Sequence, residues 1–451
     1  MLRTFLTIGL LAAVAAPAMA AAPAAPAGYE QFRETYRELI ETNTTLSSGS
    51  CTQAAQLMQA RLKAAGMSDD QLTLFVTDDH PKDGGLVAIL PGRDPRAKPI
   101  LLLAHLDVVE ARREDWTRDP FKLVEENGYF YARGALDDKA QAAIWVDTLV
   151  RFAGEHYRPR RTVKLALTCG EETTGAFNGV KWLLENRRQL IDAAFALNEG
   201  GGGQTDGKPV SNGGKLLALS LQAGEKTFQS FRVTATNPGG HSSLPIRDNA
   251  IYELADALVR LRGHEFALEM NGVSRAFFAK AGAARGDGLG KAMMALAANP
   301  GDASAEATVN TDRTLHAMLR TTCVATMLDG GHAQNALPQR ASALINCRMF
   351  PGRSTEETRA ELVAAIADPK MTVEPVPPVS LSTPVPLLDP QVTGPIERMS
   401  AKHYPGVPVI PTLFPAATDM IRLMGTHPRR LAPPHKSPAC VHIPQSPSIS
   451  S

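Results

Sequence analysis

The 451-residue chain lacks an excess of charge of either sign, since its formal net charge is +1. This balance argues against nucleic acid as the main partner and gives no reason to expect an anionic membrane surface as one. Beyond its N-terminal segment the chain also lacks an apolar run of the roughly 20 residues that cross a bilayer. Its composition is 44% hydrophobic, which together with its length predicts a globular protein of two domains.

Cysteine is sparse, and the motifs C-x-x-C and G-x-S-x-G are both missing. The five cysteines are scattered and form no C-x-x-C, so no disulfide framework is indicated, although an oxidising compartment would allow one bridge. None resembles a nucleophile, because the acidic pair near Cys169 disfavours a thiolate there. The absence of G-x-S-x-G argues against a metal-free serine hydrolase. The cysteines are Cys51, Cys169, Cys323, Cys347 and Cys440.

The N-terminal segment has the features of a secretory signal peptide. Residues 1–3 are short and basic, residues 4–16 are apolar and uncharged, and Ala18-Met19-Ala20 matches an A-x-A cleavage site. A retained membrane anchor is the alternative, but the apolar run is shorter than the roughly 20 residues a span needs. We therefore predict a signal peptide over residues 1–20, removal after Ala20, and a periplasmic or secreted protein.

Short apolar runs that alternate with helical patterns predict an α/β catalytic domain. Buried strands are expected at 86–90, 100–104, 163–168 and 193–197, with helices at 140–152 and 180–190. This alternation is typical of a mostly parallel sheet with helices on both faces. We assign residues 29–224 and 377–425 to this domain.

Residues 225–376, here called the insert, have a different pattern. Strands are expected at 227–236, 322–328, 341–348 and 371–376, with helices at 248–262 and 355–366. Ser354 and Glu357 form a capping box at the start of the last helix. The order strand, helix, strand, strand, helix, strand predicts a ferredoxin-like α+β domain, interrupted by a Gly/Ala-rich excursion at 266–320.

Two of four predicted strand ends carry a histidine or an aspartate pair. His105 and Asp107 are two residues apart on an extended chain, so they face the same way: His105 can bind a metal while Asp107 orients its ring. A polar strand end that meets solvent would look the same. Asp137 and Asp138 precede a helix, where an aspartate is also a good N-cap. One of the two can cap while the other binds metal.

The other two strand ends carry glutamates. Glu171 and Glu172 are adjacent carboxylates, which repel each other unless cations offset their charges. Because successive side chains of an extended chain point to opposite sides, one of the two can be a base and the other a metal ligand. Glu199 precedes the glycine run 200–203. A phosphate-binding loop is the alternative there, but the run lacks the G-x-G-x-x-G spacing and no helical pattern follows.

These four clusters predict a metal site, because ligands of open α/β sheets bind beyond the carboxyl ends of the strands. One histidine and several carboxylates suit hard-to-borderline divalent metals, zinc first. Two zinc ions ~3.5–4 Å apart would form a hydrolytic site.

The chain resembles the dizinc family of aminoacylases and exopeptidases, which includes glutamate carboxypeptidase, carboxypeptidase S, acetylornithine deacetylase and succinyl-diaminopimelate desuccinylase. The resemblance covers roughly residues 29–425 and leans towards the carboxypeptidase S branch, because of Glu199 and the long insert. It rests on His105-Leu106-Asp107, Arg133-Gly134-Ala135-Leu136-Asp137-Asp138-Lys139, Gly170-Glu171-Glu172, Asn198-Glu199-Gly200, Gly239-Gly240-His241-Ser242-Ser243, Asn335-Ala336-Leu337-Pro338 and Arg348.

The resemblance implies hydrolysis of a peptide or N-acyl amide bond in a small substrate with a free carboxylate. It implies that His105 and Glu199 hold one zinc, that Glu172 holds the other, and that Asp137 bridges both. Glu171 would be the general base and Asp107 would orient His105.

The resemblance also gives the insert a role at the site. His241 would steady the oxyanion, often from the partner subunit of a homodimer formed through the insert. Asn335 and Arg348 would hold the substrate, with Arg348 on its carboxylate.

The C-terminus departs from the family pattern. The family places a further zinc ligand in a His-Gly-x-x-Glu context before a final helix, whereas residues 426–451 contain six prolines and no Asp or Glu. His427, His435 and His442 lack that context, so we expect a disordered tail without the last strand or helix, and a second zinc site one ligand short. A frameshift is one explanation, and a catalytically impaired homologue that binds a ligand or partner is the alternative function.

Overall fold

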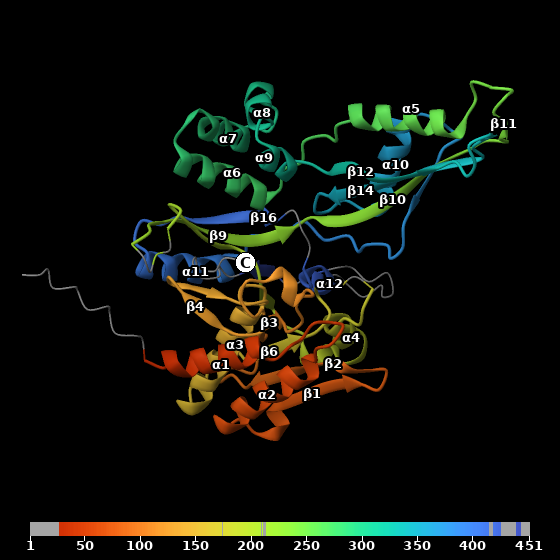
Figure 1. Cartoon of the computed structure of the whole chain (residues 1–451). Coiled ribbons are helices and arrows are strands. Elements are labelled where there is room, and N and C mark those ends of the chain that lie inside the picture. Colours follow the sequence, from red (N-terminus) through yellow and green to blue (C-terminus); the bar gives the residue numbers. More distant parts are fainter. Residues whose placement is uncertain are drawn as a thin grey trace, which may run out of the picture.

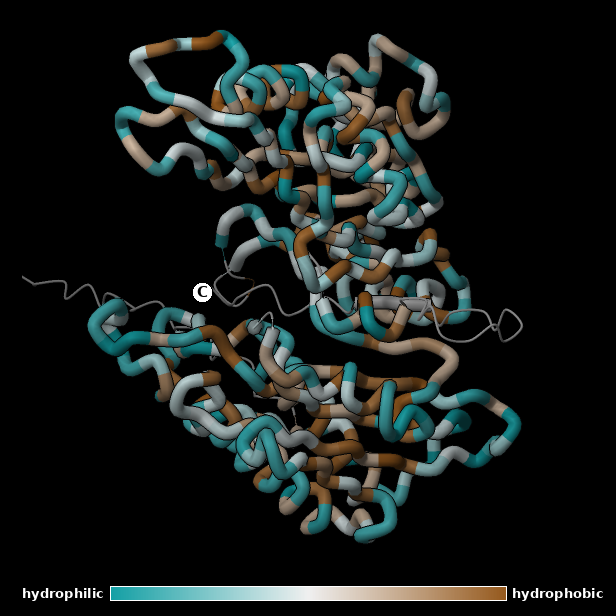
Figure 2. The backbone as a smooth tube through the Cα atoms, turned by 90° about the vertical axis from the view of Figure 1, so that its right-hand side faces the viewer, coloured by the Kyte–Doolittle hydropathy of each residue, from teal (hydrophilic) through white to brown (hydrophobic). Residues whose placement is uncertain are grey.

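The computed structural model describes residues 27–173, 175–208, 210, 213–414, 418–424 and 439–442. These residues form two lobes (Figure 1). Figure 2 shows the lobes from the side, with the most hydrophobic segments of the lower lobe running through its interior. The predicted signal peptide lies outside the described residues. Among the helices of the described ranges, none is both long and apolar enough to cross a membrane.

The lower lobe is built on a nine-stranded sheet that combines parallel and antiparallel strand pairs. β3, β6, β7 and β17 pair with one another in parallel, as do β9 and β16, whereas β1, β2 and β8 pair antiparallel with their neighbours. The predicted mostly parallel sheet is therefore a mixed one. Along the sheet the strands are β1 (Leu72–Thr77), β2 (His80–Leu90), β6 (Val163–Thr168), β3 (Ile100–His105), β7 (Phe195–Asn198), β17 (Ala439–His442), β9 (Leu216–Glu225) and β16 (Val409–Phe414), with β8 (Gly202–Thr205) beside β9.

Helices cover both faces of this sheet, as predicted. Leu102 and Ala104 of β3 belong to a core cluster with α1, α2 and α3, whereas Leu101 and Leu103 belong to one with α4 and α12. Successive side chains of a strand point to opposite faces, so β3 is buried on both sides, which explains its unbroken apolar run. The helices are α1 (Tyr29–Glu41), α2 (Cys51–Ala64), α3 (Lys139–Gly154), α4 (Gly179–Asn186) and α12 (Met420–Met424).

The upper lobe contains the second sheet, which has the ferredoxin-like order predicted for the insert. Its antiparallel strands lie in the order β12, β14, β10, β15, and residues of α5 and α10 pack in the same core cluster as the sheet. Ser354 accepts the backbone N–H of Glu357 and so caps α10. The elements are β10 (Thr227–Thr236), α5 (Ala250–Gly263), β12 (Thr322–Gly330), β14 (Arg340–Met349), α10 (Thr355–Ile366) and β15 (Thr372–Pro375).

The Gly/Ala-rich excursion is helical, which the sequence reasoning missed. Four helices share a core cluster with Ala223 of β9 and Leu413 of β16, and Figure 1 shows them above these two strands, beside the four-stranded sheet of the insert. Each follows an Asn or Asp whose side chain caps it, a signal that could have revealed them. They are α6 (Gly272–Arg285), α7 (Gly288–Ala298), α8 (Ala303–Val309) and α9 (Arg313–Met318), and α11 (Pro390–His403) leads into β16.

Two expectations are wrong. The tail was expected to lack its last strand, but β17 lies between β7 and β9 in the central sheet, where pairing with neighbours outweighs a weak local pattern. At most one disulfide was expected, but there are two, Cys51–Cys169 and Cys323–Cys347. The second pair sits directly opposite on β12 and β14. Both strands were predicted, so that bridge could have been inferred.

Candidate active site

The predicted ligands meet at the carboxyl-end edge of the central sheet. His105 is the last residue of β3 and lies in register with Thr168, the last residue of β6. Residues 170–172 follow β6, and Glu199 follows β7. Because parallel strands end at the same edge, side chains far apart in the sequence come together there.

Three side chains form a candidate metal centre. The His105 Nε2 lies 2.9 Å from Asp137 Oδ1 and 3.6 Å from Glu199 Oε2. Their ligand atoms all lie within 4.8 Å of one another. One imidazole and two carboxylates are a donor set that zinc accepts. Among the described residues, Glu172 is not part of this group, so the geometry supports one predicted zinc position more directly than the other.

Asp107 lies behind the histidine ring. The His105 Nδ1 is 3.0 Å from the backbone oxygen of Asp107 and 3.6 Å from its Oδ1. A proton on Nδ1, donated to Asp107, leaves the Nε2 lone pair directed at Asp137 and Glu199. The other oxygen of Asp107 accepts the backbone N–H of Glu172 at 3.0 Å. Asp107 therefore links the histidine to the segment that carries the glutamate pair.

The site concentrates negative charge in a poorly hydrated space. Burial is the main reason that the pKa of Glu171 rises to about 9, and the charges of Glu199 and Asp419 raise it further against the lowering effect of His105. Burial likewise raises the pKa of Glu172 to about 7. So many carboxyl groups are unfavourable together unless a cation offsets them. The charge distribution thus fits a divalent metal at the edge of the sheet.

Buried polar residues form hydrogen bonds next to the candidate metal centre. The sequence analysis gave none of these residues a role. Asn178 donates to Gly170 O at 2.9 Å and to Asp419 Oδ1 at 2.7 Å. Glu225 accepts the N–H of Thr418 at 2.9 Å. Asn178 also caps α4, and that local role was the only one its sequence context could indicate.

Two predicted residues of the insert, His241 and Asn335, are not at this edge within one chain (Figure 1). His241 is exposed and lies on β11 (Gly240–His241), which pairs with β13 (Ala336–Leu337). Asn335 is brought next to it, since its carbonyl accepts the Ser242 N–H at 2.9 Å. β11 is at the outer end of the upper lobe, far from β3 (Figure 1). Arg348 is half-buried on β14, with its guanidinium 5.5 Å from the centre of the Phe228 ring.

The family model described as peptidase family M20/M25/M40 matches residues 101–436, most of the chain and every predicted site residue. The chain belongs to this family. A protein of Dictyostelium discoideum described as "Probable carboxypeptidase S-like 2" is 28% identical over 332 residues, which are 73% of this chain and 63% of the relative. The mouse "N-fatty-acyl-amino acid synthase/hydrolase PM20D1" is 28% identical over 296 residues, 62% of this chain and 55% of the relative.

Solved structures of the M20 family share the fold. The metallo-carboxypeptidase Sso-CP2 from Sulfolobus solfataricus superposes with a TM-score of 0.59 at 19% identity, covering 86% of this chain and 87% of that one. The chain spans less than two thirds of the length of the two M20 relatives above.

Proposed function

We propose that this chain is a zinc-dependent hydrolase that cleaves a peptide or N-acyl amide bond in a small substrate with a free carboxylate. The observation that carries the proposal is the convergence of His105, Asp137 and Glu199 beside the buried Glu171. The relatives named for carboxypeptidase S and for N-fatty-acyl-amino acid hydrolysis support this substrate class.

Two zinc ions are the proposed cofactor. His105 and Glu199 would hold one ion, Glu172 the other, and Asp137 would bridge them. Bound zinc supplies Lewis-acid polarisation of the substrate carbonyl and makes water acidic enough to react at neutral pH.

We propose His442 as the further ligand beside Glu172. The parallel pairing of β17 with β7 sets His442 level with Asn198, the residue before Glu199, and so supports a position at the same edge of the sheet. A His442→Ala variant should bind one zinc ion fewer than the parent, whereas His427→Ala and His435→Ala should not. Unchanged zinc content in His442→Ala would reject this ligand, and a parent with at most one ion would favour the catalytically impaired alternative.

Glu171 is the proposed general base. It would take a proton from the attacking water and deliver it to the leaving amine nitrogen. Burial raises the pKa of Glu171, and the positive charge of bound zinc would lower it again, as a base at neutral pH requires. Replacement by glutamine should lower kcat by roughly a hundredfold to ten-thousandfold while zinc stays bound.

The test is release of an amino acid from a panel of N-acyl amino acids and dipeptides after loading with zinc. Glu171→Gln is compared with Glu155→Gln, an exposed residue after α3, which should keep parent activity. A zinc-loaded parent that cleaves nothing in the panel would refute the proposed function. Equal rates for parent and Glu171→Gln would refute only the assignment of the base.

We further propose a homodimer through the insert, with His241 and Asn335 completing the site of the partner subunit. β12 is an unpaired edge strand of the upper sheet, and its Val324, Met327 and Leu328 side chains are exposed. Such an edge favours pairing with another chain. Arg348 would bind the substrate carboxylate, and the insert would act as the lid over the catalytic domain.

Complementation tests this dimer. An equimolar mixture of His241→Ala and Glu171→Gln should regain roughly a quarter of parent activity, because about half of the dimers are then mixed and one of the two sites in each mixed dimer has both residues. No recovery from two separately inactive variants, despite exchange of subunits, would reject a contribution from the partner.

Export to the periplasm or beyond is the proposed localisation. The signal-like residues 1–20 support it, and two disulfides are typical of an oxidising compartment. N-terminal sequencing of the protein from cell fractions tests it. Mature protein that begins at Ala21 outside the cytoplasm is expected, and an uncleaved cytoplasmic chain would contradict it.

A further inference from the structure

We propose that the Cys51–Cys169 disulfide is a positioning element of the active site, which holds the segment that carries Glu171. This inference rests on the proposed function. Cys169 immediately precedes Gly170, Glu171 and Glu172, and residues 169–173 are here called the base loop. The bond joins the base loop to the first residue of α2, 118 positions away in the sequence. Both cysteines are buried, so the bond is part of the packed interior.

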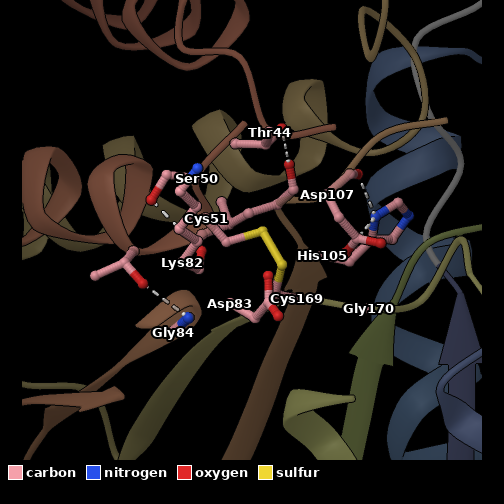
Figure 3. The surroundings of a disulfide bond; sticks show 12 residues. Thr44, Ser50, Cys51, Lys82, Asp83, Gly84, His105, Asp107, Cys169 and Gly170 are labelled. Atoms are coloured by element: carbon pink, nitrogen blue, oxygen red, sulfur yellow. Dashed lines mark hydrogen bonds and ion pairs between the residues drawn. A yellow bond between two sulfur atoms is a disulfide. The ribbon is translucent and has the colours of Figure 1, made fainter. Parts of the chain in front are cut away.

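The disulfide lies against Asp107. One ligand atom each of Cys51, Cys169 and Asp107 lies within 4.8 Å of the others. Figure 3 shows the sulfur bridge with Asp107 beside it and His105 on the far side of that aspartate. A metal at these three residues would need free thiolates, which the bond removes. The disulfide instead packs against Asp107. Asp107 in turn contacts both His105 and the base loop.

The chain before Cys51 is fastened to the same strand end. Thr44 donates its hydroxyl to Leu106 O at 2.6 Å, and its own carbonyl accepts the Val108 N–H at 3.4 Å. The disulfide therefore connects two supports of the site, the end of β3 on one side and the base loop on the other.

The base loop has few other attachments. Gly179 donates its N–H to Cys169 O at 2.8 Å, Asn178 donates to Gly170 O, and Asp107 accepts the N–H of Glu172. All three contacts are single hydrogen bonds, each contributing only about 1 kcal/mol net. The disulfide is the one covalent attachment of the loop to another element among the described residues. Without it, the described hydrogen bonds that still hold the loop are these three and the turn bond from the Ala176 N–H to Thr173 O at 3.2 Å.

The second disulfide offers a matched control. Cys323 and Cys347 are directly opposite on β12 and β14, two long strands already joined by ladder hydrogen bonds. This pair joins two strands of the upper sheet and has no part in the base loop. Opening it should remove one covalent bond from the protein without altering the base loop.

The experiment compares Cys51→Ala/Cys169→Ala with Cys323→Ala/Cys347→Ala in the full chain loaded with zinc. In the first variant we expect kcat to fall by about tenfold to a hundredfold with KM changed by less than about threefold, because misplacement of a catalytic group by about 1 Å has effects of that size. Hydrogen exchange at the base-loop amides should be at least about tenfold faster. The second variant should match the parent in base-loop exchange, which reports on the base loop and not on the insert.

Two outcomes overturn the inference. One is a first variant that equals the second in base-loop exchange and kcat. The other is a loss of activity that only follows the unfolded fraction, measured by tryptophan fluorescence. If the first variant does not fold, the natural protein is treated with dithiothreitol and alkylated, and base-loop exchange is measured on folded molecules with only that bond open. A parent without activity refutes the proposed function, and hydrogen exchange then decides the positioning role alone.

Discussion

Replacing Asn178 with aspartate isolates what one amide nitrogen contributes to the base loop. The Asn178 side-chain oxygen accepts the Lys181 N–H at 2.9 Å and caps α4, and aspartate keeps this function. Its nitrogen donates to Gly170 O and to Asp419 Oδ1, and aspartate loses both bonds. The change therefore removes two donors and leaves the helix cap in place.

The cost follows from these contacts. A buried acceptor left without its donor costs about 1–3 kcal/mol, so two of them cost roughly 2–6 kcal/mol. The new carboxyl group would also face Asp419, whose pKa is already raised, chiefly by burial. We expect the free energy of unfolding to fall by at least about 3 kcal/mol.

Asn271→Asp is the matched control. Asn271 is similarly buried and caps α6 by accepting the N–H groups of Val273 and Ser274, but its own side-chain nitrogen has no partner among the described residues. Aspartate should therefore cost less than about 0.5 kcal/mol there. Urea titrations followed by far-UV circular dichroism and by tryptophan fluorescence measure both variants. Trp182 of α4, which stacks on Phe75, reports on the region of Asn178. Equal effects at the two positions would refute the reasoning.

Three further predictions concern the same edge of the sheet. Gly170→Ala should destabilise the protein by more than about 3 kcal/mol in the same urea titration, because φ is +89° and the new Cβ would lie 1.7 Å from Phe177 O. The control Gly175→Ala has a similar φ of +88° but no described atom near its Cβ, so it should cost only about 1–2 kcal/mol. Burial raises the pKa of Glu225 to about 8 from an ordinary 4.5, so this group alone should cost the parent roughly 1.4 kcal/mol of stability for each pH unit between about 4.5 and 8. Glu171 and Glu172 add slopes of the same sign, so the stability of Glu225→Gln should fall less steeply than that of the parent by this amount, and an identical slope in melting curves would contradict the assignment. Asp107→Asn should weaken zinc binding about tenfold to a hundredfold in chelator competition, and unchanged affinity would exclude an orienting role for Asp107.

The amino-acid sequence was sufficient for elements whose pattern is local. The spans 163–168, 227–236 and 355–366 were predicted to the residue, because buried runs, alternation and a capping box depend on near neighbours only. The helices of 266–320 were missed because their Gly/Ala-rich sequence carries a weak apolar period, although their caps are present.

The candidate site divides in the same way. The sequence by itself was sufficient to propose which residues carry the chemistry, since His105 and Glu199 stand at strand ends that an α/β sheet brings together; Asp137, predicted at a strand end, instead precedes α3. Only the tertiary structure decided which residues hold the site residues in place. The contact of Asn178 with Asp419 spans 241 positions of the sequence, and the Cys51–Cys169 bond spans 118. It also decided that β17 enters the sheet, through pairing with strands more than 200 residues earlier. Such contacts form because the whole chain has folded, and no local pattern of residues records them.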